Sequence, residues 1–367
     1  MNQIELHKKI DEVIQNGSAA ITANVIRNIL QTNDDARRYF YTSADETWLN
    51  WLQQNGFLDV IKQKADDPTK YSYKTPELDY LTRIIEKAPS KVVDFILSVP
   101  VSSETFNPEV VDRFLWMSSK LNADQLMRVV GKIRDDRWVQ LMGPFNRWGF
   151  EYKQMFDTLA VAKDYVSVLT LAEAVLTVRS NEDVKRTSFG SVDNPFYFND
   201  LHHSEVFERL CEVDDAHAED ALKLATKTLS SVVLLSGEKE DEVFPIGDMF
   251  SLFDVDFFTL TVGHERHLSS RDDVRDLAAV TKIFVDRLIG KSCDATEKVR
   301  RLYETYITTL PDARTMWRFR LYTWSLCPEI FAEELKSALF RGVESEKTLW
   351  PITGGAEYEH VLRKHFG

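Results

Sequence analysis

The chain has 367 residues and a formal net charge of −13, with 44% hydrophobic and 28% charged residues. This composition is that of a folded protein rather than a disordered one, and 22 Phe, 12 Tyr and 8 Trp predict a large core. The acidic balance disfavours broad attraction to nucleic acid or to an anionic membrane, so neither is expected as a partner.

The chain starts with MNQIELHKKIDEVIQ, a pattern that predicts an amphipathic helix and lacks the apolar segment of a signal peptide. The longest apolar stretch, YVSVLTLAEAVLTV at 165–178, is too short and too interrupted to span a bilayer. The cysteines, Cys211, Cys293 and Cys327, are odd in number and form no CxxC pair. We therefore expect a cytoplasmic protein whose cysteines are thiols.

The segment DETWLNWLQQNGFLD at 45–59 places Trp48 and Trp51 on one helical stripe. Asn55 and Gly56 follow the stripe, and a glycine in this position is typical of a helix C-terminus. We expect a short helix that ends at Asn55.

Two helix starts, TPEL at 75–78 and NPEV at 107–110, lie 32 residues apart and share one local chemistry. Proline suits the first helical turn, and glutamate suits the positive end of a helix. Thr75 and Asn107 are good N-caps, and Asn122 with Gln125 predicts a capping box for a later helix. The helices predicted after these starts form two pairs, 77–86 with 90–99 and 109–119 with 123–134.

Helical spacing of apolar residues continues beyond this repeat, but without a clean period. CPEI at 327–330 predicts a third helix start of the same kind. The 248–262 segment is apolar nearly all round and predicts a buried helix, with a central strand as the alternative. The other helices expected are 151–162, 164–178, 204–212, 216–235, 274–288, 295–308, 312–326, 329–340 and 357–366.

A helix–turn–helix unit that recurs at about 30 to 45 residues is typical of an α-solenoid. The sequence therefore predicts an all-α protein of helical hairpins stacked as a HEAT/TPR-like α-solenoid, irregular in period. The polar, turn-rich segment at 181–203 predicts a loop or boundary between two helical-repeat blocks, residues 1–180 and residues 204–367.

Three segments, DETWLNWLQQNGFLD, YKTPELDYLTRI and EYEHVLRKHF, resemble parts of large bacterial HEAT-like helical-repeat proteins. The resemblance extends loosely over most of the chain and rests on helix-packing residues. It implies a HEAT-like solenoid. Because some proteins of this style belong to multidomain defence or nucleotide-driven systems, it also suggests the repeat portion of a larger bacterial assembly.

Metal ligands would have to come from the histidine-rich loops. His264 and His267 lie three apart in GHERH, and His202 and His203 precede a predicted helix, but neither group shows the paired spacing of a zinc site. A solvated loop and a helix N-terminus explain these histidines better than a metal site does, so we expect no metal and no cofactor. Asp254 and Asp256 lie in an apolar run and are expected to pair with arginine rather than to act as a catalytic dyad.

The insertion RTSFGSVDNPFYFND carries the aromatics Phe189, Phe196, Tyr197 and Phe198. Aromatic side chains exposed on a loop are good interface anchors, which makes these four the candidate interaction residues. The favoured interpretation of the segment, however, is that these aromatics fold back and cover the junction between the two helical blocks.

The segment TMWRFRLYTW at 315–324 interleaves arginine with aromatic residues, as a base-stacking platform would. Its flanks favour a helix over residues 312–326 instead. On that helix Arg318 is predicted in a solvated polar stripe, whereas Arg320 falls inside the apolar arc. We expect Arg320 to stack on an indole and to pair with a buried carboxylate.

The P-loop, GxGxxG, HExxH, GxSxG and EF-hand patterns are all missing from the sequence. The favoured function is a non-enzymatic scaffold or sensor that binds a protein partner. The alternative is a metal-assisted enzyme with its site in the central loops.

Overall fold

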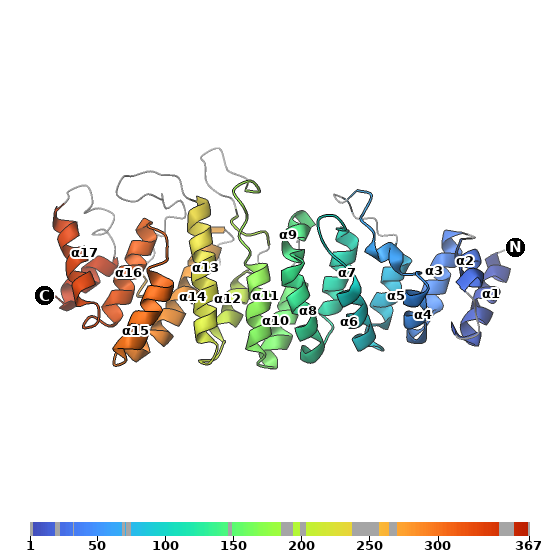
Figure 1. Ribbon diagram of the computed structural model, residues 1–367, viewed down its shortest axis with the longest axis horizontal. Helices are drawn as coiled ribbons and strands as arrows, with labels where there is room; N and C mark the ends of the chain where they lie inside the picture. The colour runs from blue at the N-terminus through green and yellow to red at the C-terminus, as the bar shows by residue number, and fades with distance from the viewer. Residues whose placement is uncertain are drawn as a thin grey trace. The chain divides into compact units, whose positions relative to one another are not determined.

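A computed structural model describes residues 3–18, 23–31, 33–67, 70, 75–145, 149–184, 194–198, 203–236, 257–263, 270–344 and 356–365. The described residues are helical or irregular, apart from bridge residues such as Val178 and Phe196, which form an isolated antiparallel bridge. The all-α prediction is confirmed for this part of the chain (Figure 1).

Two compact units divide the chain. Unit 1 comprises Met1–Asn146 and Phe150–Ala162, and unit 2 comprises Arg147–Gly149 and Lys163–Gly367. The division therefore falls before the loop predicted as the boundary, and the helix predicted at 164–178 belongs to the second unit.

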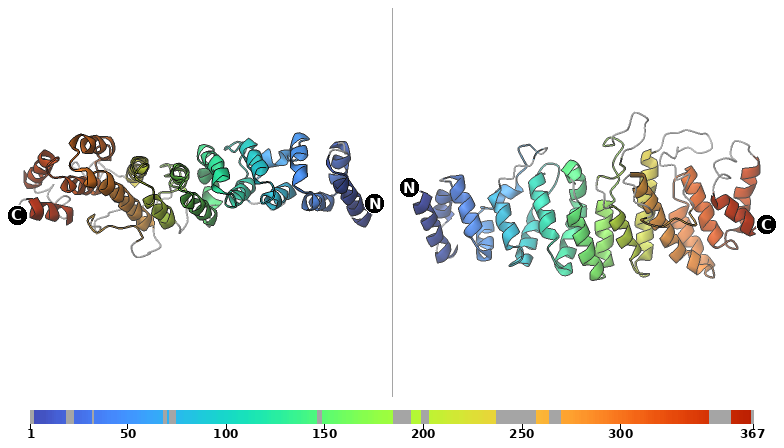
Figure 2. Two further views of the ribbon diagram at one scale, coloured as in Figure 1. Left: turned by 90° about the horizontal axis from the view of Figure 1, so that it is seen from below. Right: turned by 180° about the vertical axis from the view of Figure 1, so that it is seen from behind.

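The described residues of unit 1 form ten α-helices: α1 (Gln3–Asn16), α2 (Ala23–Leu30), α3 (Asp34–Ser43), α4 (Leu49–Gln54), α5 (Pro76–Ile84), α6 (Pro89–Ser98), α7 (Pro108–Ser118), α8 (Ala123–Asp135), α9 (Trp138–Met142) and α10 (Phe150–Val161). In the parts of unit 1 that the structure describes, contacts recur between next-but-one helices. Helix α5 packs on α3 and α7, while α6 packs on α8. The blue-to-green helices follow one another in chain order in Figure 1 and in both views of Figure 2.

Helices α5 to α8 match the two predicted pairs closely. Each buries an apolar stripe at helical spacing, such as Val92, Val93 and Ile96 on α6, and Leu126 and Val129 on α8. These helices pack on one another, α5 on α7 and α6 on α8. Each helix is therefore stabilised by packing on its neighbours rather than by its own helix propensity.

The capping box of α8 is present as predicted. The Asn122 side chain accepts from the N–H of Gln125 at 3.0 Å, and the Gln125 side chain accepts from the N–H of Asn122 at 3.4 Å. We expect Asn122→Ala to lower the free energy of unfolding by about 1 kcal/mol, because the Gln125 N–H at the start of the helix loses its acceptor. Denaturant unfolding measures this loss. Asn122→Asp retains an acceptor, and a loss equal to that of the alanine variant would contradict the capping role.

The turn after α4 depends on Gly56. Its φ is +75°, and a Cβ at this position would meet Asp59 Oδ2 at 2.9 Å. The predicted helix stop at Asn55 and Gly56 is therefore confirmed, with Phe57 N–H returning to Leu52 O at 2.9 Å.

Replacing Gly56 by alanine should lower the free energy of unfolding by about 1–2 kcal/mol, because the side chain strains a left-handed residue. Gly131→Ala is the matched control, since Gly131 lies within α8 and a Cβ there would meet nothing within 4 Å. Alanine at that helical position should stabilise by up to about 1 kcal/mol. Melting curves that shift in the same direction for both variants would refute this difference between the two glycines.

Unit 2 holds α11 (Tyr165–Val175), α12 (His203–Cys211), α13 (Ala218–Ser236), α14 (Ser270–Leu288), α15 (Thr296–Leu302), α16 (Arg314–Leu326), α17 (Ala332–Glu344) and α19 (Ala356–His365). Among its described residues, α14 packs on α12 and α13, and α16 packs on α17 and α19. The helix predicted at 295–308 is present as α15 followed by a π-helical turn at Tyr303–Ile307.

Two predicted elements of unit 2 differ from the structure. The start predicted at Pro328 is a turn, and α17 begins at Ala332. Of the buried helix predicted at 248–262, residues 248–256 lie outside the described residues and Phe257–Thr259 form a turn. Turn and helix starts share the same Pro-Glu chemistry, so the local pattern could not separate them.

Candidate functional site

The structure does not test the predicted metal candidates. His202, His264 and His267 lie outside the described residues, as do Asp254 and Asp256, and His203 is the first residue of α12. Within the described ranges, no group of three or more His, Cys, Asp or Glu side chains could hold a metal ion. A metal site in the central loops therefore stays a prediction.

Two of the four predicted aromatic anchors are buried. Phe196 is 0% exposed and Phe198 is 1% exposed, so neither is an exposed anchor, and Phe189 lies outside the described residues. Arg179 N–H and Tyr197 N–H bond to the carbonyls of Pro195 and Thr177, which fastens the segment to the end of α11. The burial fits the favoured interpretation, in which the insertion packs its own aromatics.

Tyr197 is the half-buried member of this group. Its hydroxyl donates to Asp183, the Arg179 guanidinium lies 5.9 Å from its ring centroid, and Ser180 also donates to Asp183. These hydrogen bonds lower the pKa of the Asp183 carboxyl. Tyr197 is therefore held in place by its neighbours and remains accessible on one side.

A buried ion pair links the last described helix of unit 2 to α16. Arg318 Nε donates to Glu357 Oε2 at 2.8 Å, and the two side chains are 4% and 0% exposed. The second carboxylate oxygen accepts from Arg318 Nη2 at 3.2 Å and from Phe257 N–H at 2.8 Å. The prediction that Arg318 is solvated is wrong, because α19 covers the face of α16 that was expected to meet solvent.

Arg320 is buried beside an indole as predicted, but its carboxylate partner, Asp312, is 54% exposed rather than buried. Arg320 itself is 7% exposed, and its guanidinium lies 5.1 Å from the Trp317 ring centroid. Its Nη1 donates to Asp312 Oδ1 at 2.9 Å, and its Nη2 donates to the Leu310 carbonyl at 2.6 Å. Arg320 therefore ties α16 to the turn that precedes it.

A third polar cluster joins α14 to α16. The Tyr322 hydroxyl donates to Asp286, which also accepts from Lys282 Nζ at 2.9 Å. The Lys282 ammonium lies 5.4 Å from the Tyr322 ring centroid. Phe258 packs on Tyr322 and on His360 of α19, so aromatic contacts continue from α16 to the last described helix.

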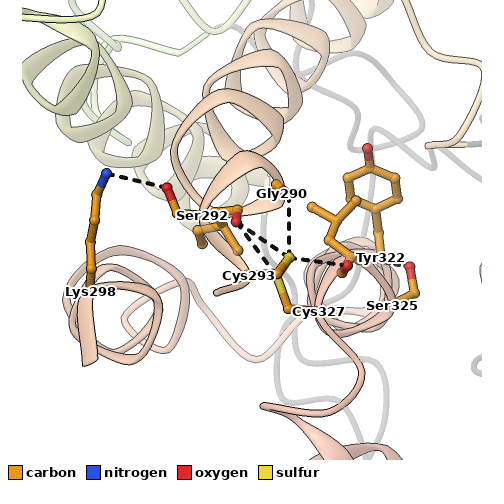
Figure 3. The surroundings of a disulfide bond; sticks show 9 residues. Gly290, Ser292, Cys293, Lys298, Tyr322, Ser325 and Cys327 are labelled. Carbon is orange, nitrogen blue, oxygen red and sulfur yellow. Dashed lines mark hydrogen bonds between the residues drawn. A yellow bond between two sulfur atoms is a disulfide. The ribbon is translucent and has the colours of Figure 1, made fainter. Parts of the chain in front are cut away.

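A disulfide joins Cys293 to Cys327, 34 residues apart (Figure 3). The prediction that all three cysteines are thiols is therefore wrong for this pair. Cys293 follows the 3₁₀ turn Gly290–Ser292 after α14, and Cys327 is the C-cap of α16. In the chain-entropy model, closing a loop of this length lowers the conformational entropy of the unfolded state. This loss stabilises the folded state by about 4 kcal/mol.

The third cysteine has a different environment. Cys211 is a free thiol at the end of α12, and burial, with the Asp276 carboxylate nearby, raises the pKa of its thiol to about 12. A thiol with such a pKa carries almost no thiolate at neutral pH, so Cys211 is a poor nucleophile.

Buried carboxylates recur at the two matched helix starts of unit 1. Glu77 is 3% exposed and Glu109 is 4% exposed. Glu77 accepts from Arg37 Nε at 2.8 Å and Nη2 at 2.6 Å, while Glu109 accepts from the Thr75 hydroxyl at 3.2 Å. Each glutamate thus links its own helix to a residue more than 30 positions earlier in the chain. The Pro-Glu pattern of the helix starts alone did not predict these hydrogen bonds.

Ion pairs with one common sequence separation connect neighbouring pairs of helices. Arg113 of α7 donates to Asp79 of α5 at 3.3 Å, and Arg128 of α8 donates to Asp94 of α6 at 2.6 Å. Both pairs span 34 residues. They are partly exposed, so each contributes at most about 1 kcal/mol, but they show that successive helix pairs meet in the same register.

Surface side chains of unit 1 include apolar ones. Met127 on α8 is 51% exposed, close to the pair formed by Arg128 and Asp94, and Lys91 on α6 is exposed as well. The outer surface of α6 and α8 thus combines both charge signs with an accessible apolar side chain, a mixture typical of protein-binding surfaces.

No helix within the described ranges has the length and apolar character needed to cross a membrane. No protein-family model, no curated protein and no solved structure matches this chain.

Proposed function

We propose that this chain is a non-enzymatic α-solenoid scaffold of HEAT/TPR-like helical hairpins that binds a protein partner. The observation that carries the proposal is the packing of next-but-one helices in unit 1, with α5 on α7 and α6 on α8. Two ion pairs, each between residues 34 positions apart, support it. One lies in the row formed by α5 and α7, and the other lies in the row formed by α6 and α8. A tandem array of this kind presents rows of side chains at regular intervals, and such rows bind extended partners.

The row formed by α6 and α8 is the proposed binding face. It offers Met127 as an accessible apolar contact, with Asp94 and Arg128 beside it as charged contacts. A partner segment with an apolar side chain flanked by charges of both signs matches this surface. Tyr197 in the insertion of unit 2 remains a second proposed contact, because it is the accessible aromatic of that segment.

Photo-cross-linking in the native cell tests the proposal. A benzophenone amino acid is placed at Met127 or Lys91, on the α6–α8 row, and at Lys120, which follows α7 and is also exposed. We expect a covalent adduct with a second polypeptide from the first two positions and not from the third, because a solenoid binds through one face. No adduct at any of the three positions would contradict the scaffold function.

The proposal includes a cytoplasmic location and membership of a larger bacterial assembly. In the cytosol, protein disulfides are usually transient or redox-sensing, whereas in oxidising compartments they persist. The Cys293–Cys327 bond therefore bears directly on the location. Blocking thiols with an alkylating reagent at the moment of cell lysis, followed by mass spectrometry of the two cysteines, would show which state the cell maintains.

A further inference from the structure

We propose that Cys293 and Cys327 form a reversible dithiol–disulfide pair that controls how firmly the C-terminal helices of unit 2 are held. The pair links the turn after α14 to the C-cap of α16, and α16 in turn carries α17 and α19. Oxidation therefore fixes the C-terminal end of α16, the helix on which α17 and α19 pack.

The surroundings of the two sulfur atoms suit both redox states. Cys293 Sγ lies 3.3 Å from the Gly290 carbonyl oxygen and 3.4 Å from that of Leu326, while Cys327 Sγ lies 3.5 Å from that of Ile289 (Figure 3). A disulfide sulfur carries no proton, so in the oxidised protein these approaches are contacts. After reduction each sulfur carries an S–H group beside a carbonyl acceptor, and the dithiol form is also accommodated.

The two sulfurs differ in accessibility. Cys327 is 2% exposed, whereas Cys293 is half-buried and lies in the turn between α14 and α15. The thiolate of a dithiol reductant therefore attacks Cys293 Sγ, forms a mixed disulfide there and expels Cys327 as a thiolate, which takes up a proton. The second thiolate of the reductant then attacks its own sulfur in the mixed disulfide and releases Cys293, which is protonated. The protein thereby gains two electrons and two protons, and the dithiol reductant is oxidised to a disulfide.

Reduction removes one of several connections between α14 and α16. The Tyr322 bond to Asp286 remains between these two helices, and the Arg318–Glu357 pair still joins α16 to α19. Unit 2 should therefore stay folded when reduced, while α16 and α17 open locally more often. The redox pair acts whether or not a partner binds to unit 1.

Hydrogen exchange on the full-length protein, with and without dithiothreitol, tests the proposal. The amides of α16 and α17 should exchange at least about tenfold faster after reduction, while those of α7 and α8 in unit 1 should not change. Mass spectrometry after alkylation, in buffers of fixed dithiothreitol redox ratio, should show Cys293 and Cys327 converting together in a reversible two-electron transition.

Two variants complete the experiment. The double variant Cys293→Ser/Cys327→Ser should show the fast exchange without reductant and no further response to it, because serine hydroxyls can donate to the same carbonyls. Cys211→Ser should respond as the unaltered protein does. Three results would overturn the proposal: alkylation of both cysteines in the oxidised protein, reduction only after unfolding, or exchange in α16 and α17 that reduction does not change.

Discussion

Glu357→Ala should lower the free energy of unfolding by about 3–5 kcal/mol, a fall in melting temperature of roughly 10 °C, because it breaks a buried ion pair by removing the carboxylate. Arg318 is 3% exposed, and Glu357 is also the acceptor of the Phe257 N–H. One substitution therefore removes a carboxylate that accepts from a buried guanidinium and from a buried backbone donor. Denaturant unfolding followed by circular dichroism measures the loss.

Glu359→Ala is the matched control, because Glu359 lies on the same helix and its side chain is 65% exposed. Its replacement should change stability by less than about 0.5 kcal/mol. Glu357→Gln keeps an oxygen acceptor for Phe257 and should fall between the two. If Glu357→Ala and Glu359→Ala behaved alike, the burial of the Arg318–Glu357 pair would be refuted.

Arg320→Ala should destabilise the protein by about 2–3 kcal/mol, because the buried Leu310 carbonyl loses its donor and Trp317 loses the guanidinium beside it. Asp312, the carboxylate partner, is 54% exposed and can be hydrated, so its own loss adds little. Thermal unfolding measures the effect, which should be smaller than that of Glu357→Ala.

Arg320→Lys separates charge from geometry. Lysine keeps the positive charge but not the planar fork that reaches Leu310 and Asp312 together, so about half of the loss should remain. Arg363→Ala, at an exposed arginine of α19, serves as the control and should leave the melting temperature unchanged. An unchanged melting temperature for Arg320→Ala would show that its placement is wrong.

Helix content was predictable because it depends on local signals. Most of the segments with apolar residues at helical spacing became helices within a few residues of their predicted bounds, for example 123–134 against Ala123–Asp135. Caps were predictable for the same reason, since Asn122 and Gln125 lie next to the N–H groups that they satisfy.

The predictions that proved wrong concern contacts between segments that are far apart in the sequence. Arg318 was expected to be solvated because the pattern of α16 alone shows a polar stripe, and nothing local indicates that α19 supplies a carboxylate to cover it. The pairing of Cys293 with Cys327 likewise depends on a helix–helix approach rather than on cysteine spacing. The buried positions of Phe196 and Phe198 depend on the loop returning to α11.

The insertion shows how limited sequence patterns are for a binding site. Its aromatic residues are equally compatible with exposure and with burial until the backbone bonds of Arg179 and Tyr197 are known. The exposed surface of α6 and α8 gave no sequence signal, because Met127 fits a helical stripe as readily as it fits a surface.

Hydrogen exchange of each helix in the Gly56→Ala variant tests the proposed solenoid organisation most directly. In a solenoid each hairpin depends on its neighbours, so strain at Gly56 should speed exchange in α3 and α4 about tenfold and leave α8 and α10 unchanged. Equal acceleration of α3, α4, α8 and α10 would mean that unit 1 unfolds as one globular core. That result would contradict the tandem-hairpin scaffold on which the proposed function depends.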